Sequence, residues 1–138
     1  MKRPNVVLHT NAADMGLEVL ARTHPDLKPA VCRDFAGLQE CLATNEPEVI
    51  FTSNFLNEPF PQGTLFGVET VKWVQNSGSG INHLMPWDPA KVTVTNSAGV
   101  AAEAMAQYGI GMMLHYGLDV PGLQADQTAR TWASRRIG

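Results

Sequence analysis

The sequence predicts an α/β fold, with a parallel sheet of about five strands, helices on both faces, and a long helix after the sheet. Short apolar runs alternate with longer segments in which apolar residues repeat at helical spacing. The clearest run, Val49–Thr52, has no two-residue alternation of apolar and polar side chains, which is typical of a strand buried on both faces of a parallel sheet.

In the first half, strands are expected at residues 5–9, 28–32 and 49–52, with helices at 14–22 and 34–44 between them. Pro25 ends the first helix, because the residue before a proline is disfavoured in the helical conformation. Pro29 places the second strand at a sheet edge, since proline cannot donate to the ladder. Asp34 is the expected N-cap of the second helix. This order of elements implies parallel strands joined by right-handed crossovers.

In the second half, residues 53–66 are expected to form a loop with one short helical turn, followed by strands at 71–75 and 92–95. A long helix at 100–117, capped by Ser97, contains many alanines and glycines. Such a thin helix favours close packing against another helix, including one from a second copy. Pro121-Gly122 is expected to end it, before a polar helix at 123–132. We therefore divide the chain into an α/β domain, residues 1–99, and linking helices, residues 100–138.

Composition excludes several classes of function. The 138 residues carry a net charge of −3, so the chain lacks the net positive charge that would attract nucleic acid. No apolar run approaches the roughly 18 residues that span a bilayer, and no signal peptide is evident, so we expect a cytoplasmic protein. The cysteines, Cys32 and Cys41, form no CxxC pair and the four histidines are scattered, which argues against a metal site. We expect reduced thiols rather than a disulfide.

The predicted site lies where the strands at 71–75 and 92–95 end in polar turns, because ligands of open α/β sheets bind at the carboxyl ends of strands. We expect contacts at residues 77–82 and 96–97. The run Gly78-Ser79-Gly80 begins like a GxGxxG nucleotide fingerprint, but His83 replaces its third glycine and no acidic residue follows near residues 95–100. The amides of Ser79 and Gly80 could instead bind a small carboxylate. A tight turn that needs glycine for its geometry would have the same sequence.

Three stretches resemble the D-isomer-specific 2-hydroxyacid dehydrogenase family: VKWVQNSGSGINHL, VTVTNSAGVAAEAMAQYGIGMML and TARTW. The resemblance implies a flavodoxin-like substrate domain and linking helix, truncated before the NAD-binding Rossmann domain. It further implies that the backbone amides of Ser79 and Gly80 hold the substrate carboxylate, with Asn96 near the substrate. Residues 59–60 (Pro-Phe) are loosely similar to a pair that lines the pocket. The helix at 100–117 resembles one that packs across the family's dimer interface.

The sequence departs from the family pattern in three respects. Asn82 stands where the family usually has an acid, and Met105-Ala106-Gln107 where its helix usually has a glutamate. The cofactor fingerprint and the family's catalytic arginine, acidic residue and histidine have no counterparts in these 138 residues. We therefore expect no catalytic, cofactor-binding or metal-binding residue in this chain, and interpret His83 as structural.

Two functions remain open. The first is a fragment or truncated form of an NAD(P)-dependent oxidoreductase acting on a small 2-hydroxy or 2-keto acid, such as phosphoglycerate, glycerate or glyoxylate. NAD or NADP would serve the parent enzyme, none would bind this chain, and the chain alone would be inactive. The alternative is a stand-alone flavodoxin-like module that dimerises or binds a small acid without catalysis. In either case we expect a homodimer through the helix at 100–117.

Overall fold

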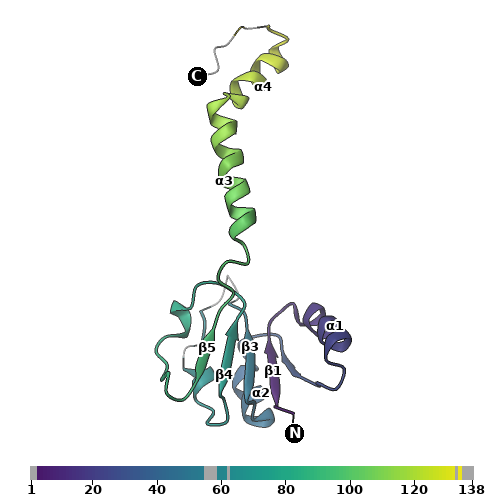
Figure 1. Cartoon of the computed structure of the whole chain (residues 1–138), viewed down its shortest axis with the longest axis vertical. Helices are drawn as coiled ribbons and strands as arrows, with labels where there is room; N and C mark the ends of the chain where they lie inside the picture. Colours follow the sequence, from purple (N-terminus) through teal and green to yellow (C-terminus); the bar gives the residue numbers. More distant parts are fainter. Residues whose placement is uncertain (1–2, 55–58, 62, 133, 135–138) are drawn as a thin grey trace. The chain divides into compact units, whose positions relative to one another are not determined.

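The protein forms two compact units, Met1–Ala98 and Gly99–Gly138, in a computed structural model that describes residues 3–54, 59–61, 63–132 and 134. The strands lie in the first unit, and the second unit contains helices α3 (Ala102–Gly117) and α4 (Val120–Ala129) (Figure 1). Among the described residues, no helix is both apolar enough and long enough to span a membrane.

The first unit is built on a five-stranded, fully parallel sheet in the order β2-β1-β3-β4-β5. Its strands are β1 (Val6–His9), β2 (Ala30–Cys32), β3 (Val49–Thr52), β4 (Trp73–Asn76) and β5 (Thr93–Thr95). This is the strand order of flavodoxin-like folds, with the change of direction between β1 and β3. The predicted α/β fold is confirmed, and β2 is an edge strand, as its preceding proline predicts.

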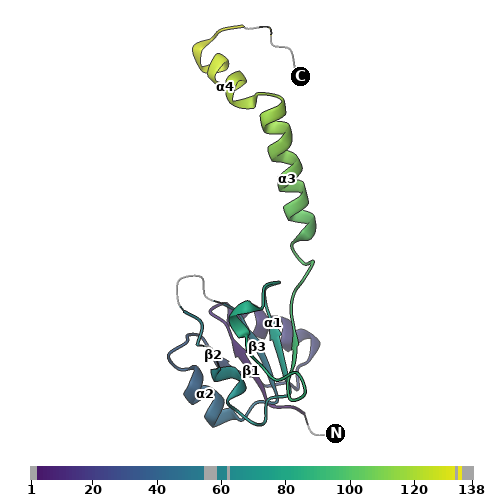
Figure 2. The same ribbon diagram turned by 90° about the vertical axis from the view of Figure 1, so that its left-hand side faces the viewer.

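Helices cover both faces of this sheet (Figure 2), again as predicted. Alternate residues of a strand point to opposite faces. Leu8 of β1 lies 3.7 Å from the position a Cβ would take on Gly16, in helix α1 (Ala13–Thr23). Val7 points the other way, into a core shared with Leu38 and Leu42 of helix α2 (Leu38–Asn45).

The two faces are buried to different degrees. On the α2 face, Ile50, Thr52 and Val74 are completely buried. On the α1 face, Val49 and Phe51 are only half-buried and Trp73 is 43% exposed. The prediction that residues 49–52 are buried on both faces is therefore wrong for the α1 face, because no described helix of this unit covers β3 and β4 there.

Two expected features of the first unit differ in detail. Gly37, not Asp34, is the N-cap of α2; the Asp34 carboxylate accepts a hydrogen bond from the Gly37 amide at 2.8 Å and so organises the turn before the helix. The loop at 53–66 contains one short helical turn, η1 (Thr64–Phe66), as predicted. Residues 55–58 and 62 of that loop lie outside the described residues.

Cys32 and Cys41 are free thiols, as expected. Burial raises the pKa of both thiols. Because the thiolate is the reactive form of cysteine, a raised pKa makes both thiols less reactive. Their side chains contribute to the packing of β2 and α2.

The second unit consists of α3 (Ala102–Gly117) and α4 (Val120–Ala129), which contact each other. The expected capping of α3 by Ser97 is wrong: the N-cap is Ala101, and the Ser97 hydroxyl donates to the carbonyl of Asn76. Pro121-Gly122 does not separate the helices either. Pro121 lies in the first turn of α4, where its missing N–H costs nothing, and Asp119 caps the helix by accepting from the Gly122 amide.

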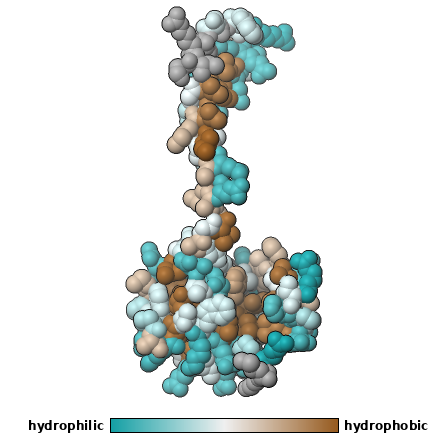
Figure 3. Space-filling view, viewed as in Figure 1, coloured by the Kyte–Doolittle hydropathy of each residue, from teal (hydrophilic) through white to brown (hydrophobic). Residues whose placement is uncertain are grey.

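Neither helix of the second unit contains a buried residue. Figure 3 shows the apolar side chains of α3 in brown. Met105, Tyr108 and Tyr116 are 71%, 71% and 69% exposed. Together with Met112 they are spaced by three or four residues and therefore share one stripe of the helix. A helix with so much apolar surface is normally covered by another element.

Candidate functional site

Three buried polar side chains form a row across the carboxyl ends of β1, β3 and β4. The strand register pairs His9 with Thr52 and Thr52 with Asn76. All three residues are at most 1% exposed and lie on the α2 face. The His9 ring Nδ1 and the Thr52 hydroxyl are 2.8 Å apart. Of the three, Asn76 is the residue whose side chain also bonds to the turn after β4.

The turn after β4, residues 77–80, is here called the glycine turn. The side-chain amide of Asn76 donates to the carbonyls of Gly78 and Gly80, both at 2.9 Å. The Gly78 carbonyl also accepts from the backbone N–H of Ser97, at 3.1 Å. The Asn76 side chain and the backbone that follows β5 therefore fix the conformation of the turn.

Asn96 holds a third carbonyl of the turn. Its side-chain amide donates to the Ser79 carbonyl at 2.7 Å, and its oxygen accepts from the backbone N–H of Ala98 at 3.3 Å. Because β5 lies beside β4, the turns that follow the two strands are neighbours, and Asn96 joins them. The sequence-predicted residues Ser79, Gly80 and Asn96 are thus brought together.

The backbone amides of Ser79 and Gly80 are the groups left for a ligand. In a planar trans peptide, each N–H points away from the carbonyl of the preceding residue. With the Gly78 carbonyl tied to Asn76 and the Ser79 carbonyl tied to Asn96, the next two N–H groups point away from those anchors. Both residues are exposed, and neither amide donates a hydrogen bond within the described part of the chain. Two such donors suit a carboxylate.

An aromatic cluster lies on the same face as the polar row. The Phe60 ring packs edge-on against His83, with ring centroids 4.8 Å apart, and also contacts Phe35 and His9. His83 follows the glycine turn by three residues, so the loop containing Phe60 is joined to the segment after the turn. Burial lowers the pKa of His83, and the buried Nε2 of that ring has no hydrogen-bond partner among the described residues.

His9 is held neutral in this cluster. Burial lowers its pKa to about 4, although the neighbouring Asp34 opposes the shift. A neutral, completely buried imidazole bonded to Thr52 is a structural group of the sheet.

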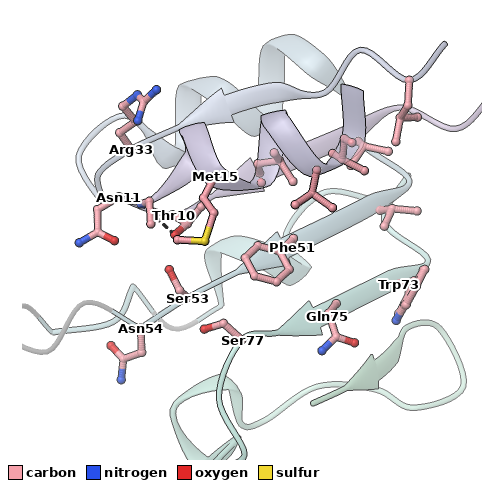
Figure 4. Close-up of a pocket in the computed structure, with 18 of the residues that line it drawn as sticks. Thr10, Asn11, Met15, Arg33, Phe51, Ser53, Asn54, Trp73, Gln75 and Ser77 are labelled. Carbon is pink, nitrogen blue, oxygen red and sulfur yellow. Dashed lines mark hydrogen bonds between the residues drawn. The ribbon is translucent and has the colours of Figure 1, made fainter. Parts of the chain in front are cut away.

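A separate open groove of about 1110 Å³ lies on the α1 face of the sheet (Figure 4). Its floor contains Phe51 and Trp73, and Met15 of α1 forms part of one wall. Ser53 and Ser77, at the carboxyl ends of β3 and β4, form a polar rim. Of the residues expected to bind a ligand, only Ser77 lines this groove.

Sequence reasoning missed Asn76 and the polar row beneath it. The signal was present, because an asparagine directly before a glycine-rich turn commonly bonds to the backbone a few residues on. The row itself depends on strand register, which the sequence does not state. Within the described residues, no cluster of histidine, cysteine or acidic side chains could hold a metal ion.

Comparison with known proteins found no matching family model and no matching curated protein. Solved structures do match. A D-isomer-specific 2-hydroxyacid dehydrogenase family protein from Aeromonas salmonicida is 17% identical, with a TM-score of 0.78 over 99% of this chain. The D-lactate dehydrogenase of Aquifex aeolicus, solved with NAD and lactic acid, is 15% identical, with a TM-score of 0.68 over 97% of this chain.

A D-isomer-specific 2-hydroxyacid dehydrogenase from Xanthobacter autotrophicus, solved with NADPH and MES, is 21% identical, with a TM-score of 0.67 over 99% of this chain. The chain shares the fold of these dehydrogenases. It spans 43%, 40% and 43% of the lengths of the three neighbours. The correspondence is therefore with a part of each of these proteins.

Proposed function

We propose that this chain is the acid-binding part of a D-2-hydroxyacid dehydrogenase. The observation that carries the proposal is the pair of consecutive amides of the exposed residues Ser79 and Gly80, on a turn in which the side chains of Asn76 and Asn96 hold three carbonyls. The fold shared with solved dehydrogenases of this family supports the same conclusion. The complete enzyme would transfer a hydride between NAD or NADP and a small 2-hydroxy or 2-keto acid.

Each residue of the site has a defined role in this proposal. The Ser79 and Gly80 amides bind the carboxylate of the acid, and Asn96 holds the turn with one N–H while presenting its exposed amide to the substrate side. Hydrogen bonds to a charged group contribute roughly 1.5–3 kcal/mol each. Two such bonds together contribute about 3–6 kcal/mol, a range that includes the roughly 4 kcal/mol of a millimolar dissociation constant.

The chain by itself is proposed to be catalytically inactive. It orients the acid, but the hydride carrier supplies the redox chemistry, and these residues include no GxGxxG fingerprint with which to bind one. The proposed acid is a small one such as glyoxylate, glycerate or phosphoglycerate, and the two amides specify its carboxylate and not the group beyond it.

A calorimetric titration tests the proposal with a matched pair of ligands. Glycolate and glycolamide have nearly the same shape, but only glycolate carries the negative charge that the amides would bind. We expect glycolate to bind with millimolar affinity and glycolamide to bind at least tenfold more weakly. Equal affinity for both, or binding of neither, would contradict the proposal. Mixtures with NADH or NADPH and glyoxylate are expected to show no oxidation of the nucleotide above the rate without protein.

A second function, assembly of two copies, is favoured by the stripe of Met105, Tyr108, Met112 and Tyr116 on α3, in which Met112 is half-buried and the other three are exposed. Lining up with the same stripe of another copy would remove these side chains from water. In this alternative the chain acts as a dimerisation or acid-binding module without catalysis. A homodimer that binds neither glycolate nor glyoxylate would favour the alternative over the dehydrogenase proposal.

A further inference from the structure

We infer that Asn76 is the positioning residue of the glycine turn, and that its side-chain amide sets the direction of the acid-binding N–H groups. The inference rests on the proposed function and deepens it. Asn76 does not reach the ligand itself, because it is 1% exposed beneath the turn.

The bonding of Asn76 is specific to an asparagine. Both bonds from its amide nitrogen end on carbonyls of the turn, those of Gly78 and Gly80, at equal lengths of 2.9 Å. An aspartate in this place would have only acceptors when ionised, and a leucine would have neither donor nor acceptor. Of side chains with this shape, only asparagine can donate two hydrogen bonds from one nitrogen.

The backbone of Asn76 is itself fixed from three directions. The residue pairs with Thr52 in the parallel ladder, and its carbonyl accepts from the Ser97 hydroxyl at 3.1 Å and from the Gln75 side chain at 2.8 Å. An anchor held this firmly can impose a single conformation on an exposed turn that includes two glycines. Without it, the Gly80 carbonyl would lose this bond and the Gly78 carbonyl would keep only the one from the Ser97 backbone N–H, so the intervening amides would lose their common orientation.

Thr52 supplies a matched control. Its side chain is also completely buried in the polar row, one strand away, but its hydroxyl bonds to the His9 ring and not to the turn. Thr52→Val removes a buried polar group of the sheet while leaving the Asn76 bonds in place. Asn76→Leu removes the two bonds to the turn and keeps the branched shape of the side chain.

The test uses the full chain, labelled with ¹⁵N, and two readouts. The first, without acid, is the chemical shift and hydrogen-exchange rate of the Ser79 and Gly80 amides. We expect Asn76→Leu to move both shifts toward random-coil values, and Thr52→Val to leave them unchanged. The second is the glycolate dissociation constant, which we expect to rise at least tenfold in Asn76→Leu and less than twofold in Thr52→Val.

The outcomes separate the inference from the proposed function. Native shifts in Asn76→Leu, or an equal loss in Thr52→Val, would overturn the positioning role. If the wild-type chain binds no glycolate, the proposed function fails, and the shifts measured without acid still decide the role of Asn76. If Asn76→Leu does not fold, Asn76→Asp, which keeps the shape and loses the donors, is measured without acid and is expected to show the same loss of native turn shifts.

Discussion

The side-chain nitrogen of Asn76 lies 2.9 Å from the carbonyl oxygen of Gly80, four residues further along the chain. This bond runs from the buried end of β4 to the exposed end of the glycine turn. It restricts a segment that contains two glycines to one conformation. The same nitrogen bonds Gly78, and Asn96 bonds the residue between them.

Removing the Asn96 side chain is expected to weaken acid binding. Asn96→Ala deletes the 2.7 Å bond to the Ser79 carbonyl, so the Gly80 amide is no longer held in one direction. A bond of this kind contributes about 0.5–1.5 kcal/mol, which corresponds to a two- to tenfold rise in the glycolate dissociation constant. The exposed amide of Gln107, in the second unit, is the control, and Gln107→Ala is expected to leave glycolate binding unchanged. Unaltered affinity in Asn96→Ala would remove Asn96 from the site.

Acid is expected to destabilise the fold through His9. The unfolded chain binds a proton at this residue near the ordinary pKa of 6.5, whereas the folded chain does so only at about 4. Stability therefore falls as the pH drops from 6.5 toward 4, by an amount of about 3 kcal/mol for this group. His9→Gln removes this contribution, so the loss of stability across that interval should be smaller than in the wild type.

Urea unfolding at pH 7, 6, 5 and 4.5 measures the effect. The control is His24→Gln, which removes a histidine from the surface and should retain the steep acid dependence caused by His9. If His9→Gln and the wild type lose the same stability between pH 7 and 4.5, the buried neutral histidine does not control the acid response.

Two glycines in the loop before β4 test whether a left-handed backbone conformation there is costly for alanine. Gly63 has a φ of +82°, which favours glycine, and it precedes η1. Gly63→Ala is expected to cost about 1 kcal/mol of unfolding free energy. Gly67 ends η1 with a φ of −76°, and a Cβ there would meet backbone oxygens only at ordinary contact distance, so Gly67→Ala is expected to be nearly neutral. Equal effects of the two substitutions would mean that the left-handed conformation of Gly63 carries no cost for alanine.

Much of this fold follows from sequence pattern alone. The apolar runs and the prolines beside them locate all five strands to within about two residues, because buried strands cannot contain many polar groups. The beginnings of helices are less predictable. Asp34 and Ser97 both have side chains suited to capping, but Asp34 caps a turn that precedes its helix, and Ser97 bonds to Asn76. Local propensity does not reveal which of several partners a hydroxyl or carboxylate will choose.

The sequence pointed to the backbone amides of the candidate site, but not to the buried side chain that holds the turn. Ser79 and Gly80 stand out as consecutive small residues after a strand, and Asn96 follows the next strand. Asn76 acquires its role only through the register that aligns the ends of β3 and β4. The half-exposed α1 face of β3 was not predictable either, since an apolar strand sequence does not show which of its faces a helix covers.

Assembly through α3 is expected to depend on its apolar stripe. Tyr108→Lys places a charge at the centre of the stripe, and Gln107→Lys places the same charge one residue earlier, where Gln107 bonds to Glu103. If two copies associate through this stripe, Tyr108→Lys should weaken dimerisation at least tenfold in sedimentation equilibrium, and Gln107→Lys should change it less than threefold. A monomeric wild-type chain at high concentration, by light scattering, would refute the homodimer.

The most direct test of the proposed acid-binding role is a ¹H–¹⁵N spectrum of the full chain, recorded during a titration with glyoxylate. The account predicts that the Ser79 and Gly80 amide resonances shift downfield in a saturable, millimolar transition, with the Asn96 side-chain amide following the same curve. The resonances of residues in the α1-face groove, such as Phe51 and Val19, should not shift during the titration. Shifts confined to that groove, or no saturable shift at Ser79 and Gly80, would contradict the account.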